Sequence, residues 1–135
     1  MPLLKVDNIA CHYDDEKIFD SLSFHVNRGE IVSLLGRNGV GRSTTCKTIM
    51  GLVSPKGSIM YQGQEIAGLK SHLIARRGIG FVPENMGIFS ELTVEENMQV
   101  AILKEDDATR QRLEDVLQMF TALKDFWGAK AGILS

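Results

Sequence analysis

A glycine-rich run between positions 36 and 44 has the residue types and spacing that phosphate binding needs. The run is Gly36, Arg37, Asn38, Gly39, Val40, Gly41, Arg42, Ser43 and Thr44. Its glycines leave room for backbone N–H groups to turn inward around phosphate oxygens, and a helix that begins there adds a favourable dipole. Ser43 offers a hydroxyl to a magnesium ion, and Thr44 can donate to a phosphate oxygen. The alternative is a glycine-rich turn that serves backbone geometry alone.

Arg42 stands where the phosphate-binding pattern G-x-x-x-x-G-K-[ST] has lysine. A lysine ammonium is a compact charge on a flexible stem, whereas a guanidinium is planar, wider and fixed in its donor geometry. The positive charge is kept, but its placement between phosphates changes. We therefore expect nucleotide to bind more weakly than it would with lysine, and γ-phosphate transfer to suffer more than binding.

Elements on both sides of this loop must position it. Residues 31–35 form a short apolar run with little alternation, which predicts a strand covered on both faces within a parallel sheet. Residues 43–50 predict a helix that closes at Gly51. A second apolar strand of the same kind is predicted at residues 79–82, after a short helix at 71–77.

The beginning of the chain predicts further strands, and its end predicts helices. Strands are expected at residues 4–9, 21–26 and 57–66, the last with a tight turn at Gly63. Thr93 and Glu96 have the spacing of a capping box, so a helix should follow through Ile102 or Leu103. An apolar stripe then recurs at helical spacing and predicts an amphipathic helix that packs into a core: Leu113, Val116, Leu117, Phe120 and Leu123.

Composition excludes several classes of protein. The chain has 135 residues, with 15 Lys or Arg against 17 Asp or Glu and no basic stretch, which argues against nucleic-acid binding. No apolar run approaches the roughly 20 residues of a membrane helix, and the first residues lack the layout of a signal peptide. Cys11 and Cys46 form no CxxC pair and no metal spacing with the histidines, so we expect two reduced thiols.

Four segments together resemble the ATP-binding subunit of ABC transporters, specifically the branched-chain amino acid and urea importer group. They are Tyr13, the loop LLGRNGVGRST, the segment RRGIGFVPENMGIF, and LTVEEN. The resemblance covers the whole chain. It implies an α/β fold of the P-loop NTPase class, namely the N-terminal portion of an ABC cassette. This portion comprises an antiparallel β subdomain, RecA-like core strands with the P-loop helix, and the start of an α-helical subdomain.

The resemblance also implies how residues 1–135 divide within one partial ATP-binding domain. Residues 1–30 and 57–68 would form the β subdomain, 31–56 and 69–84 the nucleotide-binding core, and 85–135 the Q-loop and an incomplete helical subdomain. The family continues with a signature loop that begins Leu-Ser-Gly-Gly, so the sequence would end inside it at Leu134-Ser135. The family's Walker B Asp, catalytic Glu and H-loop His follow that point, and so do strands that flank residues 31–35. We expect no complete catalytic set and an exposed apolar sheet edge.

Individual roles follow from the same resemblance. Tyr13 matches the aromatic residue that stacks on adenine, and Glu84 matches the Q-loop position, where many members have a glutamine that touches magnesium or the attacking water. The implied cofactors are ATP and Mg²⁺, with Ser43 and Glu84 as metal ligands. From the residues alone, a tyrosine placed like Tyr13 is more often ordinary packing, and the alternative for Glu84 is a solvated loop acid.

The implied partners are transmembrane permease subunits and a second ATP-binding subunit. The loop from Glu84 to Phe89 would face the permease, and its Met86, Ile88 and Phe89 could form an apolar socket or instead begin a core. The protein would then be cytoplasmic and peripheral on the inner face of the plasma membrane. No nucleic acid is expected as a partner.

The implied function is to couple ATP binding and hydrolysis to uptake of branched-chain amino acids, urea or amides. For this chain alone we expect nucleotide binding, and enzyme activity stays open. One alternative is a non-catalytic, degenerate cassette fragment, which Arg42 favours. The other is a P-loop kinase for small molecules, in which Tyr13 and Glu84 would have no role.

Overall fold

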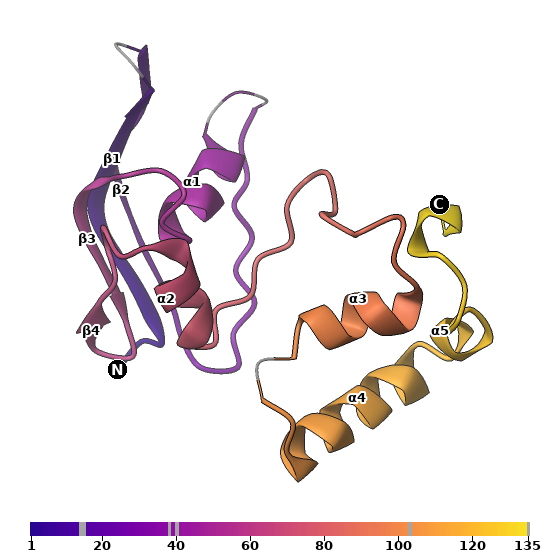
Figure 1. The fold of residues 1–135 in the computed structure, drawn as a ribbon. Coiled ribbons are helices and arrows are strands. Elements are labelled where there is room, and N and C mark those ends of the chain that lie inside the picture. The colour runs from indigo at the N-terminus through magenta and orange to yellow at the C-terminus, as the bar shows by residue number, and fades with distance from the viewer. Residues whose placement is uncertain (14–15, 38, 40, 103, 135) are drawn as a thin grey trace. The chain divides into compact units, whose positions relative to one another are not determined.

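The computed structural model describes residues 1–13, 16–37, 39, 41–102 and 104–134. For Tyr13, Glu16 and Lys17, which lie near the ends of two strands, the backbone is described but the side chain is not. The chain divides into two compact units, Met1–Phe81 and Val82–Ser135. The first unit combines a sheet with two helices, and the second is helical (Figure 1).

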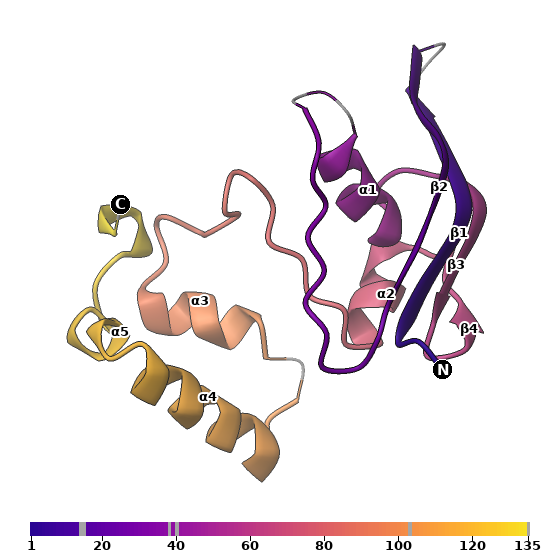
Figure 2. The same cartoon turned by 180° about the vertical axis from the view of Figure 1, so that it is seen from behind.

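The first unit is built on an antiparallel sheet with strand order β2-β1-β3-β4. Its strands are β1 (Leu4–Tyr13), β2 (Glu16–Val26), β3 (Lys56–Tyr61) and β4 (Gln64–Glu65). Helices α1 (Arg42–Ile49) and α2 (Ser71–Arg76) lie on the same face of this sheet in both views (Figures 1 and 2). The core between sheet and helices consists of Val6, Ile9, Met50, Ile59, Ile66 and Ile74. Burial of these apolar side chains is the main source of stability for the unit.

Strand β1 changes the side on which it buries its residues. Val6 is buried, but beyond Asn8 the buried positions are Ile9 and Cys11. Asn8 has a positive φ of 49°, and the pairing register with β2 shifts between Val6 and Ile9. A bulge of this kind explains the weak alternation in residues 4–9. Gly57 of β3 passes close to it, since a Cβ there would lie 2.5 Å from the carbonyl oxygen of Asn8.

Most predicted elements of the first unit are confirmed. The strands predicted at residues 4–9 and 21–26 form and are longer than expected. The predicted hairpin over residues 57–66 forms as β3 and β4, with a positive φ of 76° at Gly63. Helix α1 begins and ends one residue before the predicted helix, and α2 ends one residue before its predicted end.

The two predicted apolar strands are wrong. Residues 31–35 and 79–82 have no regular secondary structure. Ile31, Leu35 and Val82 are 95%, 89% and 83% exposed. A parallel strand covered on both faces needs hydrogen-bonded neighbours, and the sheet of the described residues pairs only β1 to β4, all antiparallel. Residues 31–35 are therefore no part of a sheet, and the exposed sheet edge expected beside them does not form in the described residues.

The second unit contains α3 (Val94–Val100), α4 (Asp107–Met119), α5 (Ala122–Asp125) and the 3₁₀ turn η1 (Ala131–Ile133). The predicted capping box is confirmed: Glu96 N donates to Thr93 Oγ1 at 3.1 Å, and Thr93 N donates to Glu96 Oε2 at 2.7 Å. Helix α3 ends before the predicted Ile102 or Leu103, and Leu103 itself lies outside the described residues.

The stripe predicted to pack into a core is only half-buried. No residue of α4 is buried, and Phe120, at the C-cap, is 56% exposed. The helix ends at Met119, so the last two residues of the stripe lie beyond it. Four of the five stripe residues are half-buried and Phe120 is exposed, so the prediction that the stripe packs into a core is confirmed only in part.

Glu65 ties β4 to β3 through its carboxylate. The carboxylate accepts hydrogen bonds from Ile59 N at 2.9 Å, from Ala67 N at 3.0 Å and from the Ser58 hydroxyl. Burial raises the pKa of Glu65, but these hydrogen bonds lower it, and the net pKa lies below its ordinary value. Because the folded-state pKa is depressed, this stabilisation is present above the unfolded-state pKa and is lost as the pH falls through the folded-state pKa.

We expect Glu65→Ala to lower the free energy of unfolding by about 1 kcal/mol at neutral pH, because three hydrogen-bond donors lose their charged acceptor. The effect stays this small because the carboxylate is largely solvated. Glu65→Gln is the matched control, since its oxygen still accepts but it cannot ionise. Urea denaturation between pH 7 and pH 3 should show the gap between wild type and Glu65→Gln closing in acid. A gap that stays constant over this range would contradict a depressed pKa.

Candidate functional site

The glycine-rich loop ends at the N-terminus of α1 in a defined backbone geometry. Gly39 and Gly41 have φ values of +83° and +93°, in the left-handed region that favours glycine. Thr45 N and Thr45 Oγ1 both donate to the carbonyl oxygen of Gly41 at 2.8 Å. Because this is the first bond of the helix, the N–H groups of the preceding turn point out of its N-terminus. An anion is favoured at such a helix end.

The remaining predicted loop residues surround this helix start. Gly36, Arg37 and Arg42 are exposed, while Ser43 and Thr44 in the first turn of α1 are half-buried. Asn38 and Val40 lie outside the described residues. Tyr13 ends β1, and its side chain also lies outside the description, so its role stays a prediction.

Strand β2 supplies one wall beside the helix start. A hollow of about 230 Å³ lies there, lined by Phe19, Asp20, Ser21, Leu22, Leu34, Leu35, Gly41, Arg42 and Thr45. The alternating pattern predicts this strand only from residue 21 onward, so Phe19 is not among the predicted site residues. The signal available was the apolar pair Ile18-Phe19 directly before the predicted strand.

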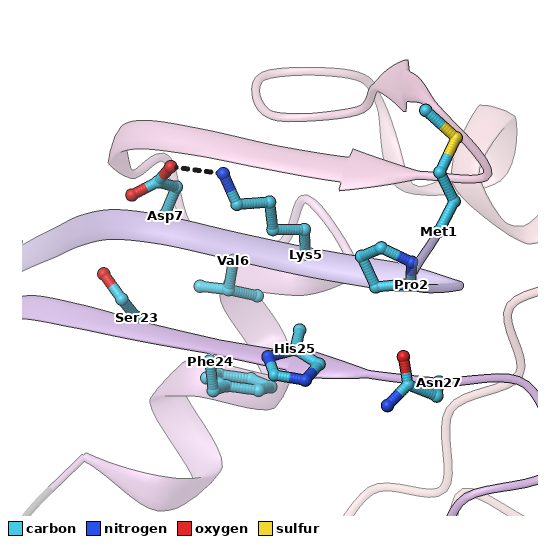
Figure 3. Close-up of a pocket in the computed structure, with 9 residues that line it drawn as sticks. All are labelled: Met1, Pro2, Lys5, Val6, Asp7, Ser23, Phe24, His25 and Asn27. Carbon is cyan, nitrogen blue, oxygen red and sulfur yellow. Dashed lines mark hydrogen bonds and ion pairs between the residues drawn. The ribbon is translucent and has the colours of Figure 1, made fainter.

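A larger open pocket of about 520 Å³ lies elsewhere in the first unit, along the ends of β1 and β2 (Figure 3). Its lining includes Met1, His25 and Asn27, and none of the predicted site residues. Lys5 Nζ donates to Asp7 Oδ2 at 2.8 Å, so these two charges of the pocket already satisfy each other.

Glu84 and the loop that follows it belong to the second unit. Glu84 is exposed, and Met86, Ile88 and Phe89 are 72%, 52% and 55% exposed. Their exposure contradicts the alternative in which Ile88 and Phe89 begin a core. Ser43 lies in the first unit and Glu84 in the second, so a shared metal ion stays a prediction.

Asn97 of α3 holds the end of this loop. Its Oδ1 accepts from Phe89 N at 2.9 Å, and its Nδ2 donates to the carbonyl oxygens of Phe89 and Thr93, both at 2.9 Å. A carboxamide can accept and donate at once, which no carboxylate does when ionised. The sequence patterns described above predict no role for Asn97. Its signal was an amide one position after the capping glutamate in LTVEEN.

Metal and membrane features are limited in the part of the chain that the structure describes. There, no three His, Cys, Asp or Glu side chains gather into a metal-binding group. No helix of the described residues is long and apolar enough to cross a bilayer. Cys11 is buried and Cys46 exposed, and both are free thiols as expected.

A family model described as "ABC transporter" matches residues 19–135. The chain belongs to the ABC transporter family. The predicted resemblance and fold class are thereby confirmed, because the matched range includes most of β2, the whole glycine-rich loop and the helical unit.

Three relatives from this family are similar over most of the chain. The high-affinity branched-chain amino acid transport ATP-binding protein BraG of Pseudomonas aeruginosa is 38% identical, covering 98% of this chain and 58% of the relative. The lipopolysaccharide export system ATP-binding protein LptB of Haemophilus influenzae is 37% identical, covering 89% and 52%. The probable branched-chain amino acid transport ATP-binding protein LivF of Archaeoglobus fulgidus is 31% identical, covering 98% and 57%. The chain thus spans a little over half the length of these relatives.

Solved ABC cassettes have the same fold. An ATP-binding subunit of an ABC transporter superimposes with a TM-score of 0.81 at 32% identity, covering 95% of this chain and 54% of the other. An ATP-binding cassette in its ADP conformation superimposes with a TM-score of 0.79 at 25% identity, covering 100% of this chain and 59% of the other. The described residues therefore correspond to part of an ABC cassette.

We expect Asn97→Ala to release the loop that ends at Phe89, because the Phe89 amide loses its acceptor and three carbonyl oxygens lose a donor. Exchange of the Phe89 amide hydrogen should accelerate about tenfold or more, which corresponds to one lost hydrogen bond of about 1.4 kcal/mol. Gln99→Ala is the control on the same helix, because Gln99 makes only an exposed side-chain contact with Glu95 at 3.3 Å. Equal exchange of the Phe89 amide in both variants would contradict the assigned role.

Proposed function

We propose that this chain binds ATP with Mg²⁺ through its glycine-rich loop, as part of the ATP-binding subunit of an ABC transporter. The observation that carries the proposal is the start of α1, where left-handed Gly41 ends the loop and its carbonyl is anchored twice by Thr45. This arrangement directs backbone N–H groups toward the loop, which is the geometry a polyphosphate requires. Membership of the ABC transporter family supports ATP as the ligand.

The residues present fit these cofactors. A Cβ built at Gly39 would meet no atom within 4 Å, so the loop has open space beside its backbone at this point. Ser43 and Thr44 lie in the first turn of α1 and are half-buried there. In this proposal the backbone from Gly36 to Thr44 surrounds the phosphates, Tyr13 stacks on adenine, and Ser43 and Glu84 hold the metal. A bound magnesium ion would neutralise part of the phosphate charge.

Arg42 decides how tightly the phosphates are held. Its side chain is exposed at the first position of α1, where its charge adds to the helix dipole. Because a guanidinium is wider than an ammonium and fixed in its donor geometry, we infer that nucleotide binding is weaker but retained and that hydrolysis is disfavoured more strongly. A nucleotide-binding cassette with little or no catalysis is therefore the second candidate function, and Arg42 is the observation that favours it.

The transported substrate is inferred from the relatives. BraG and LivF are both named for branched-chain amino acid transport, and BraG has the highest identity of the three relatives described above. LptB is named for lipopolysaccharide export. We propose that the intact transporter takes up branched-chain amino acids or related small amides. In it the exposed loop from Glu84 to Phe89 would contact the permease subunits on the cytoplasmic face, beside a second ATP-binding subunit.

We expect calorimetric titration with ATP and Mg²⁺ to show binding to the wild-type chain, and Arg42→Lys to bind roughly fivefold or more tightly, a gain of about 1 kcal/mol. Arg28→Lys is the matched control, since Arg28 lies in the exposed turn after β2 and outside the loop. It should bind ATP as the wild type does.

Two outcomes would count against these assignments in different ways. Equal affinity of wild type and Arg42→Lys would contradict the role given to Arg42 while leaving nucleotide binding intact. No heat of binding in either protein, at concentrations where both are folded, would contradict the proposed function itself.

A further inference from the structure

Strand β2 lies against the glycine-rich loop at Gly41. A Cβ built at Gly41 would lie 2.8 Å from Cδ1 of Phe19 and 3.1 Å from Cγ2 of Ile18. A side chain at position 41 would therefore require the Phe19 ring to move. The Gly41 backbone therefore lies directly against the edge of the Phe19 ring.

Gly41 is held from its other side by α1. Its carbonyl oxygen accepts both the amide and the hydroxyl of Thr45, a residue that is only 2% exposed. The φ of +93° at Gly41 is therefore enclosed between a ring on the strand and a buried threonine on the helix. Two elements that are far apart in sequence meet at this one residue.

The Phe19 ring is itself well anchored. Phe19 pairs with Cys11 of β1, which is fully buried, and it packs against the hydrophobic core together with Leu22. Regular alternation would send Phe19 and Leu22 to opposite faces of the strand. Ser21, between them, has a positive φ of 53° and changes the phase of β2, so both side chains reach the core.

We propose that Phe19 is a positioning residue of the phosphate loop, holding Gly41 in the left-handed conformation that aims the first amides of α1 at a bound phosphate. This inference rests on the proposed nucleotide binding and names a residue that acts on it through Gly41. Without the ring, Gly41 samples more conformations. Phosphate binding must then order the loop, and this loss of conformational entropy lowers the affinity. The adenine end of the nucleotide makes no use of this contact, so its affinity is unaffected.

The test compares Phe19→Ala with Phe24→Ala in the full chain. Phe24 is on the same strand and packs against the same core, but it pairs with Val6, five residues further along β2. Its loss removes a similar amount of core packing without touching the loop. Calorimetry with ATP, inorganic pyrophosphate and adenosine measures the affinity for the phosphate end and for the adenine end of the ligand separately. Hydrogen exchange of the Thr45 amide reports the stability of its hydrogen bond to the Gly41 carbonyl oxygen.

Phe19→Ala should weaken pyrophosphate and ATP binding about tenfold and accelerate exchange of the Thr45 amide about tenfold, with adenosine affinity unchanged. Phe24→Ala should change none of these beyond its effect on global stability, and Phe19→Leu, which restores apolar bulk, should recover most of the loss. Equal changes in the two alanine variants, in binding or in exchange, would overturn the proposal.

The exchange measurement separates this inference from the proposed function. If the wild type binds no pyrophosphate and no ATP while Thr45 exchange responds selectively to Phe19→Ala, the contact is upheld and nucleotide binding is refuted. If Thr45 exchange is the same in Phe19→Ala and Phe24→Ala, the contact has no positioning effect, whatever the ligand affinities.

Discussion

The packing of α1 against one face of the antiparallel sheet decides where the glycine-rich loop ends. Met50, at the end of α1, joins Val6, Ile9 and Ile59 of the sheet in one buried cluster, and Thr45 and Thr48 are buried within the helix. With the helix held at this end, its N-terminus is presented beside β2, where Gly41 meets Phe19. The position of the phosphate-binding amides is thus set by apolar burial in residues that never touch a ligand.

Local patterns predicted the elements whose partners are near in sequence. The β3–β4 hairpin, the capping box of Thr93 and Glu96, and α1 all formed as expected, because turn glycines and cap residues act within a few positions. Residues 31–35 behaved differently. Their apolar, β-branched character describes what a strand interior needs, but a strand also needs neighbours, and pairing is a long-range property that composition does not reveal.

The candidate site, too, could be predicted from the sequence only in part. Residue types alone predicted the loop from Gly36 to Thr44 and the anion preference of the following helix. Glycines, a hydroxyl and a cation at this spacing are typical of a phosphate-binding loop. The contacts of Phe19 and Asn97 could not be predicted, because each depends on a backbone irregularity or a loop path. The positive φ at Ser21, for example, turns Phe19 toward the core against the alternation that a strand pattern assumes.

The most direct test of nucleotide binding at the loop is an NMR titration of the ¹⁵N-labelled chain with ATP and Mg²⁺, followed by amide chemical shifts. We expect the largest shifts at Gly39 and from Gly41 to Thr44, while residues of the pocket shown in Figure 3, such as His25, stay unchanged. Saturable shifts centred on that pocket, or no saturable shift at the loop, would contradict nucleotide binding at the loop.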